Sequence, residues 1–242
     1  MKFENTRVWG FEGALRGMRN PKNSWDKSDT VYGIALNEQE ANARATNWVK
    51  LEEDKNNNAF TFISIGENDL KLCQTLIKSG NEHRKFMRQI FVSVDITAPD
   101  FWYKEFDTYK VGTVANSTST MHKIMSKPFT PDMFQYDGIR EQDYAFFETL
   151  LERLNSLRNE YLETKDKKTW KTLIELLPMN YLFTRTVTMN YENLIAMCSK
   201  GQRRFHKLNE WSGIDNPEEE NFIKWARTLP YAQELIFIDE VS

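Results

Sequence analysis

One segment constrains the fold of this chain more than any other feature: apolar residues recur at every second position in it, and a proline follows shortly after it. In residues 90–96, Ile-Phe-Val-Ser-Val-Asp-Ile, apolar side chains occupy every second position, which predicts a strand with one buried face. Thr97-Ala98-Pro99-Asp100 follows, and it fits the pattern of a helix start with an early proline. A strand that turns at once into a capped helix, carrying Phe101–Tyr109, is therefore expected here.

The segment after this helix is unusually rich in hydroxyl and amide groups. Val111–His122 contains four threonines and serines within Ser117–Thr120, together with Thr113 and Asn116. Such side chains compete with the backbone for hydrogen bonds and are poor choices for a buried helix face. We expect a loop or helix cap that offers many hydrogen-bond partners, and we consider His122 as a general base, although a single histidine in a polar loop is common.

The rest of the chain mixes helical patterns with short strands. The N-terminal 1–35 segment is rich in turn formers and charges, which predicts an irregular lobe. Phe183–Asn190 fits either a strand or a helix. Helices are expected at Asn37–Leu51, Asp69–Ser79, Tyr144–Glu163, Lys167–Leu177, Tyr191–Ser199 and Arg203–Trp211 and after Pro217, and a strand at Phe60–Ile65. Together these elements predict an α+β fold with several long helices, forming a single domain over residues 1–242.

Composition narrows the possible functions. The net charge of −3 and the pI of about 5.8 disfavour binding to a polynucleotide. No segment is long and apolar enough to span a bilayer, and the start resembles no secretion signal, so we expect a cytoplasmic protein. Two cysteines in apolar helical contexts and three separated histidines predict neither a disulfide framework nor a metal site.

The common catalytic motifs are absent from the sequence. It contains no Gly-x-Gly-x-x-Gly, no GxxxxGK[ST] loop and no Gly-x-Ser-x-Gly elbow. The acidic runs Glu52-Glu53 and Glu218–Glu220 are more typical of solvated surfaces than of paired acid-base carboxylates. Chemistry based on side chains alone is therefore poorly supported, and some enzymes leave the difficult step to a cofactor that the protein binds and orients.

The order of elements from Glu82-His83 onward resembles the flavin-dependent thymidylate synthases. In that family, Phe-Glu-His leads into a strand, and a helix then ends in the signature RHRxxSxNExSxR. Aligned without gaps from Ala98, the signature's Arg-His-Arg falls on Thr108-Tyr109-Lys110, and the Arg-Gln before it falls on Lys104-Glu105. The later signature positions fall on Thr113, Ala115, Asn116, Thr118 and Thr120, while a register shifted by one aligns Asn116 and Ser119 and brings His122 near the signature's end.

A second segment carries the same resemblance. Leu177-Pro178, Phe183-Thr184-Arg185 and Asn190 are similar to the family's LP, YTR and Asn, with the spacing from proline to asparagine kept. The family continues with Asn-x-Arg, whereas this chain has Glu192 at the arginine position. The family's later Leu-Arg corresponds to Arg203 or Arg204. The family's arginines at Thr108, Thr120 and Glu192 are therefore replaced, and a threonine hydroxyl does not reproduce a bidentate guanidinium–phosphate contact.

The resemblance implies a fold, a reaction and a set of site residues. The fold would be of the thymidylate synthase ThyX type, with a small antiparallel sheet. The reaction would convert dUMP to dTMP with FAD, NADPH and methylenetetrahydrofolate, or modify a related pyrimidine nucleotide, in a homo-oligomer, possibly a tetramer. The implied cofactor-binding residues are Tyr109, Lys110 and Asn190, and the implied substrate-binding residues are Lys104, Glu105, Asn116, Thr118, Ser119, Arg203 and Arg204.

The replaced arginines leave an alternative of a different class. A ThyX-like protein that binds a nucleotide, or only assembles, without making dTMP is also consistent with the sequence. The resemblance itself implies no catalytic side chain. Enzyme and binding protein therefore remain alternatives at this point; flavin binding would favour the enzyme, and dUMP-dependent oxidation of the reduced flavin would then test its substrate.

Overall fold

The computed structural model describes residues 1–240, which form two compact units. We call the first the hairpin unit; it comprises Met1–Lys2, Asp95–Thr108 and Ala115–Thr186. We call the second the main unit; it comprises Phe3–Val94, Tyr109–Val114 and the chain from Val187 onward. No helix within residues 1–240 is long and apolar enough to span a membrane.

A four-stranded sheet in the order β1-β5-β7-β6 is built by strands from distant parts of the sequence. Its strands are β1 (Lys2–Trp9), β5 (Phe91–Pro99), β7 (Leu182–Asn190) and β6 (Val114–Ser117). Along β5, Val92, Val94 and Ile96 are buried at alternate positions, which confirms the predicted half-buried strand. The ambiguous Phe183–Asn190 segment is a strand, β7.

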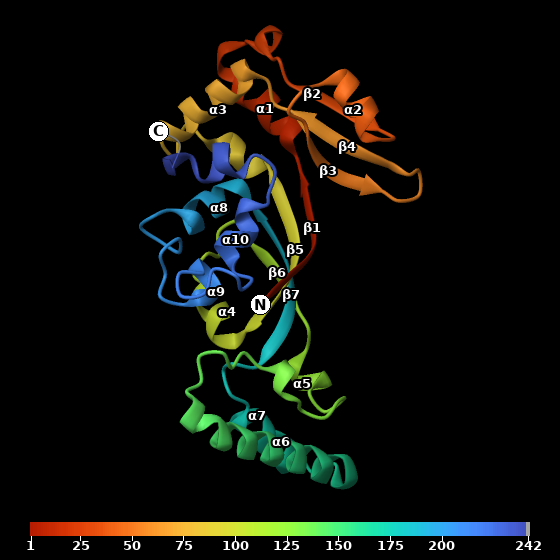
Figure 1. Cartoon of the computed structure of the whole chain (residues 1–242), viewed down its shortest axis with the longest axis vertical. Coiled ribbons are helices and arrows are strands. Elements are labelled where there is room, and N and C mark those ends of the chain that lie inside the picture. Colours follow the sequence, from red (N-terminus) through yellow and green to blue (C-terminus); the bar gives the residue numbers. More distant parts are fainter. Residues whose placement is uncertain (241–242) are drawn as a thin grey trace. The chain divides into compact units, whose positions relative to one another are not determined.

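The hairpin unit takes its name from two neighbouring helices, α6 (Tyr144–Thr164) and α7 (Lys167–Leu176), shown in green in Figure 1. Asp166 caps α7 by accepting a hydrogen bond from the backbone N–H of Thr169. A buried apolar cluster holds the pair against neighbouring loops; its members include Phe129, Phe134, Phe147, Leu151, Leu154, Leu157 and Leu173. The unit also contains α4 (Asp100–Phe106) and α5 (Thr120–Lys123). Both long helices were predicted from apolar spacing and are confirmed.

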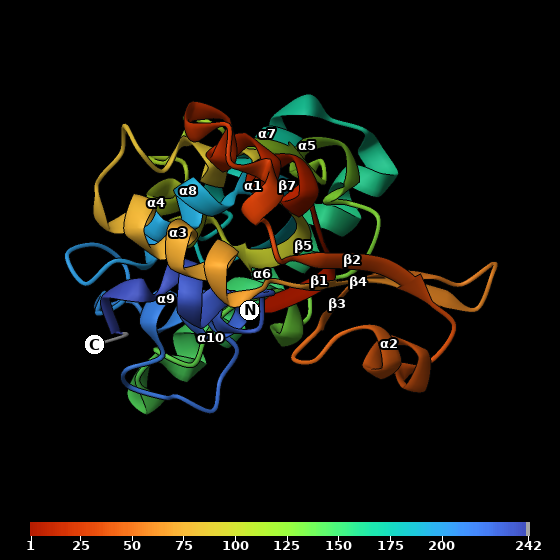
Figure 2. The ribbon, with the colours of Figure 1, turned by 90° about the horizontal axis from the view of Figure 1, so that it is seen from above.

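The main unit contains a second sheet, which is antiparallel in the order β2-β4-β3. Its strands are β2 (Val31–Ala35), β4 (Ala59–Ser64) and β3 (Val49–Asp54), and α2 (Glu38–Arg44) lies beside them in Figures 1 and 2. The other helices are α1 (Phe11–Arg19), α3 (Glu67–Lys78), α8 (Tyr191–Cys198), α9 (Asn209–Ser212) and α10 (Phe222–Arg227). Small antiparallel sheets among many helices confirm the α+β class.

The free edge of β2 is covered by one arginine from α2. Arg44 donates hydrogen bonds to the carbonyl oxygens of Ile34 at 2.8 Å and Tyr32 at 3.3 Å. A Cβ atom on Gly33 would lie 2.6 Å from the guanidinium carbon, so only glycine leaves room for this approach. Edge carbonyls that could pair with another strand are thereby occupied within the chain.

Two predictions near the N-terminus, one of a helix and one of an irregular segment, are wrong in part. The predicted helix Asn37–Leu51 ends at Arg44, because Val49 onward pairs with β4 and tertiary pairing overrides local propensity. Residues 1–35, predicted to be irregular, contain β1, α1 and β2. Trp9 stacks on Phe91 of β5, with the ring centres 5.7 Å apart.

The predicted cap at Thr97 is also wrong. The Thr97 hydroxyl forms a hydrogen bond with the Thr184 hydroxyl at 2.7 Å, so β5 continues to Pro99 and α4 begins without a side-chain cap. This helix ends at Phe106 rather than at Tyr109. The predicted loop Val111–His122 contains the short elements β6 and α5.

The C-terminal helices are shorter than predicted. Residues 203–208 turn instead of forming a helix, because the backbone N–H of Arg203 bonds to the Met197 carbonyl and reverses the chain. Only α9 remains of the predicted Arg203–Trp211 helix. The closing helix begins at Phe222, where Asn221 accepts a hydrogen bond from the backbone N–H of Lys224, and not directly after Pro217.

Candidate functional site

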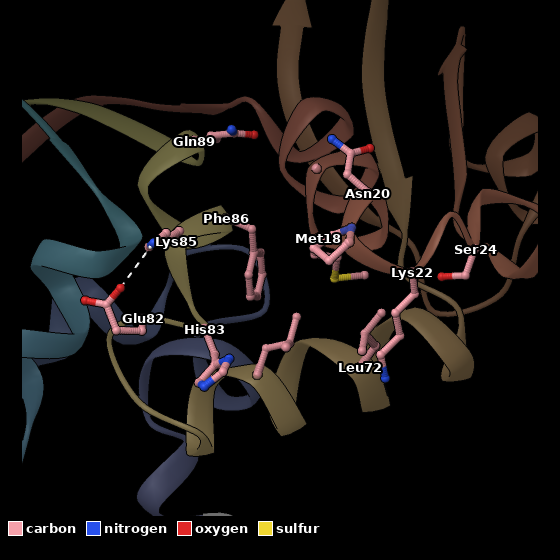
Figure 3. Close-up of a pocket in the computed structure, with 13 residues that line it drawn as sticks. Met18, Asn20, Lys22, Ser24, Leu72, Glu82, His83, Lys85, Phe86 and Gln89 are labelled. Carbon is pink, nitrogen blue, oxygen red and sulfur yellow. Dashed lines mark ion pairs between the residues drawn. The ribbon is translucent and has the colours of Figure 1, made fainter.

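A cavity of about 480 Å³ lies beside the C-terminal end of α1 in the main unit (Figure 3). Its apolar wall consists of Met18, Leu72, Leu76 and Phe86, and its polar lining of Asn20, Lys22, Ser24, Glu82, His83, Lys85 and Gln89. In Figure 3 the Phe86 ring and the Met18 side chain face one another, and Lys22 lies next to Leu72. Cavities of this size, apolar with a few polar groups, are typical of small-ligand sites.

A buried ion pair shapes the wall of this cavity. Arg19 Nε donates to Asp69 Oδ1 at 2.6 Å, and both side chains are almost fully buried. The same guanidinium donates to the Ser24 carbonyl oxygen at 3.1 Å, which ties the loop after α1 to α3. The contact of Arg19 with Asp69 and Ser24 lies behind the cavity. It holds Asn20, Lys22 and Ser24 at the mouth of the cavity.

The pKa of Asp69 shows that this contact favours the ionised carboxylate. Burial alone would raise the pKa of Asp69, but hydrogen bonds from Ser28, Thr30 and Arg19 outweigh burial and lower it. The hydroxyls of Ser28 and Thr30 each lie 2.6 Å from Asp69 Oδ2. Both carboxylate oxygens of Asp69 therefore accept hydrogen bonds from side chains of the chain itself, and the carboxylate is not available to a ligand.

The charged side chains that line the cavity are two lysines, Lys22 and Lys85, and one glutamate, Glu82. Lys85 Nζ lies 3.1 Å from Glu82 Oε2, in an exposed pair that contributes little to stability. Lys22 makes no ion pair within the part of the chain that the structure describes. With Lys22 and His83 beside an apolar wall, the cavity suits a planar ring that carries an anionic or hydrogen-bonding group.

Sequence reasoning found only part of this cavity. It noted Glu82-His83 as family-like, but it assigned no binding role to Lys22, Asn20 or Ser24. The available signal was the turn-rich Asn20-Pro21-Lys22-Asn23-Ser24 run directly after a helix, since conserved function often resides in loops held by rigid elements. That signal does not reveal which of its side chains face inward.

The start of α8 holds one of the predicted cofactor ligands. Asn190 Oδ1 accepts from the backbone N–H of Asn193, and Asn193 Oδ1 accepts in return from the backbone N–H of Asn190, which forms a reciprocal cap. Asn193 Nδ2 also donates to the Val111 carbonyl oxygen at 2.6 Å. A Cβ on Gly112, whose φ is +81°, would lie 2.9 Å from Asn190 Nδ2. Asn190 therefore has a structural task that accounts for its position.

Tyr109 and Arg203 are two predicted site residues that the structure brings together. The guanidinium carbon of Arg203 lies 5.5 Å from the Tyr109 ring centre and 5.3 Å from that of Trp211. The Tyr109 hydroxyl donates to Gln202 Oε1 at 3.2 Å. Lys110 follows on the exposed surface. An aromatic and cationic surface is thus formed by residues almost one hundred positions apart in the sequence.

Arg204, the neighbour of Arg203, is buried and engaged with the C-terminal segment. Its Nη2 atom lies 2.6 Å from Asp239 Oδ1, its Nη1 atom 3.2 Å from Glu240 Oε1, and its Nε atom donates to the Cys198 carbonyl oxygen. A hydrogen bond from Arg227 is the main cause that lowers the pKa of Glu240. These contacts give Arg204 a structural role.

The remaining predicted residues belong to the hairpin unit. Lys104 forms an exposed ion pair with Asp100 at 3.1 Å, and Glu105 lies beside it on α4. Thr118 pairs through its backbone with Thr184, and Ser119 caps α5 by accepting from the backbone N–H of His122. Asn116 and His122 are exposed. The predicted ligands are thus divided between the two units.

Comparison with known proteins finds likeness in structure and none in sequence. No family model and no curated protein matches the sequence. Two crystal structures of ThyX from Helicobacter pylori, each with FAD and dUMP, match with a TM-score of 0.61 and 13% identity. The match covers 99% of this chain and 99% or 98% of theirs.

The chain has the ThyX fold.

The family that the sequence resembles has an arginine two residues after the asparagine that corresponds to Asn190. This chain has a negatively charged residue at that position. Glu192 occupies it and pairs with Arg84, whose Nε atom lies 2.9 Å from Glu192 Oε2. Both side chains are mostly buried. A guanidinium is therefore present here, but it comes from the residue after His83 and is neutralised by a carboxylate.

Proposed function

We propose that this chain is a ThyX-like enzyme that binds FAD and dUMP, or a related pyrimidine nucleotide. The likeness to ThyX structures solved with these two molecules extends over essentially the whole chain, which supports the proposal. The single observation that carries it is the cavity of Figure 3, which joins an apolar wall to cationic groups.

The residues of the cavity fit part of such a ligand. Phe86, Leu72 and Leu76 offer flat apolar surface to a ring system, and Asn20, Ser24 and Gln89 offer hydrogen bonds to ring edges. Lys22 and Lys85 at the mouth would attract a phosphate or carboxylate. We propose that Tyr109 and Arg203, with the exposed Lys110, form a further binding surface for a planar anionic group, and that Lys104, Glu105 and Asn116 contact substrate.

The chain's own part in the chemistry would be to bind, orient and exclude water. A reduced flavin supplies hydride transfer when bound, with NADPH and methylenetetrahydrofolate as the co-substrates that the resemblance implies. Lys22 would hold an anionic group in place, and the Met18 and Phe86 side chains would keep water from the ring. His83 offers one donor or acceptor nitrogen at the cavity wall.

Flavin binding tests the proposal directly. The purified protein, or the protein incubated with FAD and then desalted, should show absorption near about 450 nm, and FAD should raise the unfolding temperature. With flavin bound, adding dUMP should accelerate reoxidation of the reduced protein in the presence of methylenetetrahydrofolate. A colourless protein whose unfolding temperature does not respond to FAD would end the assignment.

A second function is favoured by a specific observation. Arg84 is neutralised by Glu192, Arg204 is buried against two carboxylates, and Thr120 replaces a third expected arginine. A protein that binds a nucleotide on a ThyX fold without making dTMP would need fewer phosphate contacts. Flavin binding without any dUMP-dependent turnover would favour this alternative.

We also propose that residues 1–242 act as one functional domain that assembles into a homo-oligomer, possibly a tetramer. The sequence resemblance supports this proposal. Sedimentation equilibrium tests it, because a tetramer has a mass about four times that of the 28.6 kDa chain.

A further inference from the structure

A short loop between α3 and β5 forms one wall of the cavity in Figure 3. We call residues 80–86 the cavity loop. The side chains that it contributes to the cavity are labelled in Figure 3: Glu82, His83, Lys85 and Phe86. Gly80 begins the loop with a φ of +99°, and its carbonyl oxygen accepts hydrogen bonds from the backbone N–H groups of His83 at 3.0 Å and Arg84 at 3.2 Å. These two bonds shape the loop, but they do not attach it to the rest of the main unit.

One ion pair ties the polar part of the cavity loop to another element. Arg84 Nε donates to Glu192 Oε1 at 3.0 Å and lies 2.9 Å from Glu192 Oε2. The Lys85 side chain pairs with Glu82, inside the loop. Within residues 1–240, Arg84 is the one side chain of the cavity loop that forms a hydrogen bond or an ion pair outside the loop. The position of the loop therefore depends on its contact with Glu192.

The contact between Arg84 and Glu192 is strong because it is charged and poorly screened. The two side chains are 18% and 15% exposed, so dissolved ions and water screen the pair only weakly. Removing one charge of such a pair leaves the other away from water without a partner, which is unfavourable. The pair thus holds the Arg84 side chain more firmly than a hydrogen bond between neutral groups would.

Glu192 is itself held in place at the start of α8. Its neighbour Tyr191 is fully buried. The backbone N–H of Tyr191 donates to the Ile90 carbonyl oxygen at 3.0 Å, and its hydroxyl donates to the Pro230 carbonyl oxygen at 2.6 Å. Glu192 does not line the cavity of Figure 3. Any effect of Glu192 on a ligand in that cavity is therefore carried by the residues that it holds.

We propose that Glu192 is a positioning residue for the cavity of Figure 3. Through Arg84 it fixes the cavity loop, and the loop places the His83 and Lys85 side chains on the cavity wall. Side chains that bind a ligand need such support from surrounding residues, because a displacement of about 1 Å weakens their contacts. This role of Glu192 rests on the proposed function in one respect: the cavity is taken as the binding site for FAD or dUMP.

Hydrogen exchange tests the positioning in the protein without a ligand. Glu192→Gln keeps the size of the side chain and removes its charge. The backbone amides of His83 and Arg84 should then exchange faster by roughly tenfold, because the loop opens more often, while the amides of α3 keep their rates. The double variant Arg84→Glu with Glu192→Arg exchanges the two charges and should bring the loop rates back to within roughly threefold of those of the unaltered protein. NMR detection resolves the individual amides.

Ligand affinity provides the second measurement. Glu192→Gln should weaken FAD or dUMP binding by roughly tenfold, although the residue touches neither molecule, and the charge-exchanged double variant should recover most of the loss. Asp239→Asn is the matched control, because it replaces a carboxylate in another arginine pair of the main unit, with Arg204, and should leave the affinity unchanged. Titration calorimetry measures the affinities, and thermal unfolding shows that each variant is folded.

Unaltered exchange of the loop amides in Glu192→Gln would overturn the inference. Exchange that rises equally in the loop and in α3 would also overturn it, since that result marks a general loss of stability, as would a double variant whose loop stays as labile as in Glu192→Gln. A faster loop with unchanged affinity would show that the positioning does not reach the ligand. If the unaltered protein binds neither FAD nor dUMP, the proposed function fails, whereas exchange of the loop amides still decides whether Glu192 positions the loop.

Discussion

The start of α8 and the cavity beside α1 differ in how completely their polar groups are used. At the start of α8, Asn190 and Asn193 cap each other, and Asn193 also holds the Val111 carbonyl. At the cavity, Lys22 has no ion pair within the described residues, and Gln89 lines open volume, while Asn20 and Ser24 are each bonded through only part of their polar groups, to Trp25 and Arg19. The first region is closed by its own side chains, and the second is open to a ligand.

This difference teaches that a motif position and a binding position need not coincide. Asn190, the strongest prediction from sequence, is engaged in the closed region, whereas the open region is lined by residues that the sequence did not assign. Removing a side chain should therefore cost stability in the closed region and ligand affinity in the open one.

Arg204→Met should cost the most stability. The substitution removes a buried guanidinium that pairs with Asp239 and Glu240 and bonds to the Cys198 carbonyl. We expect the free energy of unfolding to fall by about 2–3 kcal/mol, because Asp239 and the Cys198 carbonyl lose their partner while Glu240 keeps only Arg227. Urea denaturation measures the change, with Arg153→Met on the exposed face of α6 as the control. Equal stabilities of the two variants would contradict the structural role of Arg204.

Lys22→Ala should weaken FAD or dUMP binding by roughly tenfold and change the free energy of unfolding by less than about 0.5 kcal/mol. Lys22 lines the open cavity and makes no ion pair with a described side chain. Titration calorimetry and urea denaturation provide the two measurements, and Lys27→Ala is the matched control. If Lys22→Ala binds both molecules as the unaltered protein does, the cavity is not their site.

Asn190→Ala should lower the free energy of unfolding by about 1 kcal/mol, because the first turn of α8 loses its side-chain acceptor. Flavin affinity should stay within twofold, roughly, of that of the unaltered protein if the residue is only a cap. Asn116→Ala, on the exposed strand β6, is the control for stability. A large loss of flavin affinity with unchanged stability would reverse our view of the two regions.

Acid should destabilise the fold through Glu240 and Asp69, and one variant separates their contributions. Folding lowers the pKa of Glu240 through the Arg227 hydrogen bond, and hydrogen bonds lower that of Asp69 despite its burial. Groups with a lowered folded pKa stabilise the fold above their unfolded pKa, and this contribution is lost as the pH falls through the folded value. The free energy of unfolding should thus decrease as the pH falls below about 5. Arg227→Met should reduce this dependence without abolishing it, since Asp69 remains; an identical pH dependence would exclude Glu240 as a contributor.

Much of the fold follows from local patterns. The alternation of residues 90–96 predicted β5, and apolar spacing predicted α6, α7 and α8, because these elements bury one continuous face. The failures have long-range causes. Thr97 was expected to cap a helix but bonds to Thr184 across the sheet, and Val49–Leu51 was expected to be helical but pairs with β4.

The candidate site was less predictable than the fold. The sequence placed family-like residues in the expected order. The environment of each residue in the structure, however, depends on neighbours that are distant in sequence. Arg203 and Arg204 are adjacent and chemically identical, but one lies over Tyr109 and Trp211 and the other is buried against the C-terminal segment. No local pattern distinguishes them, since the distinction arises from where Asp239 and Glu240 return to the fold.

The contact between Gly33 and Arg44 makes two positions interdependent. A side chain at position 33 would displace the guanidinium from the carbonyls of Tyr32 and Ile34, and the loss of Arg44 would expose those carbonyls next to an exposed Ile34. Either change alone would leave carbonyl groups at the edge of β2 without a partner, and a strand of another molecule could then pair with this edge. Across related sequences, glycine at 33 and arginine at 44 should therefore be gained and lost together.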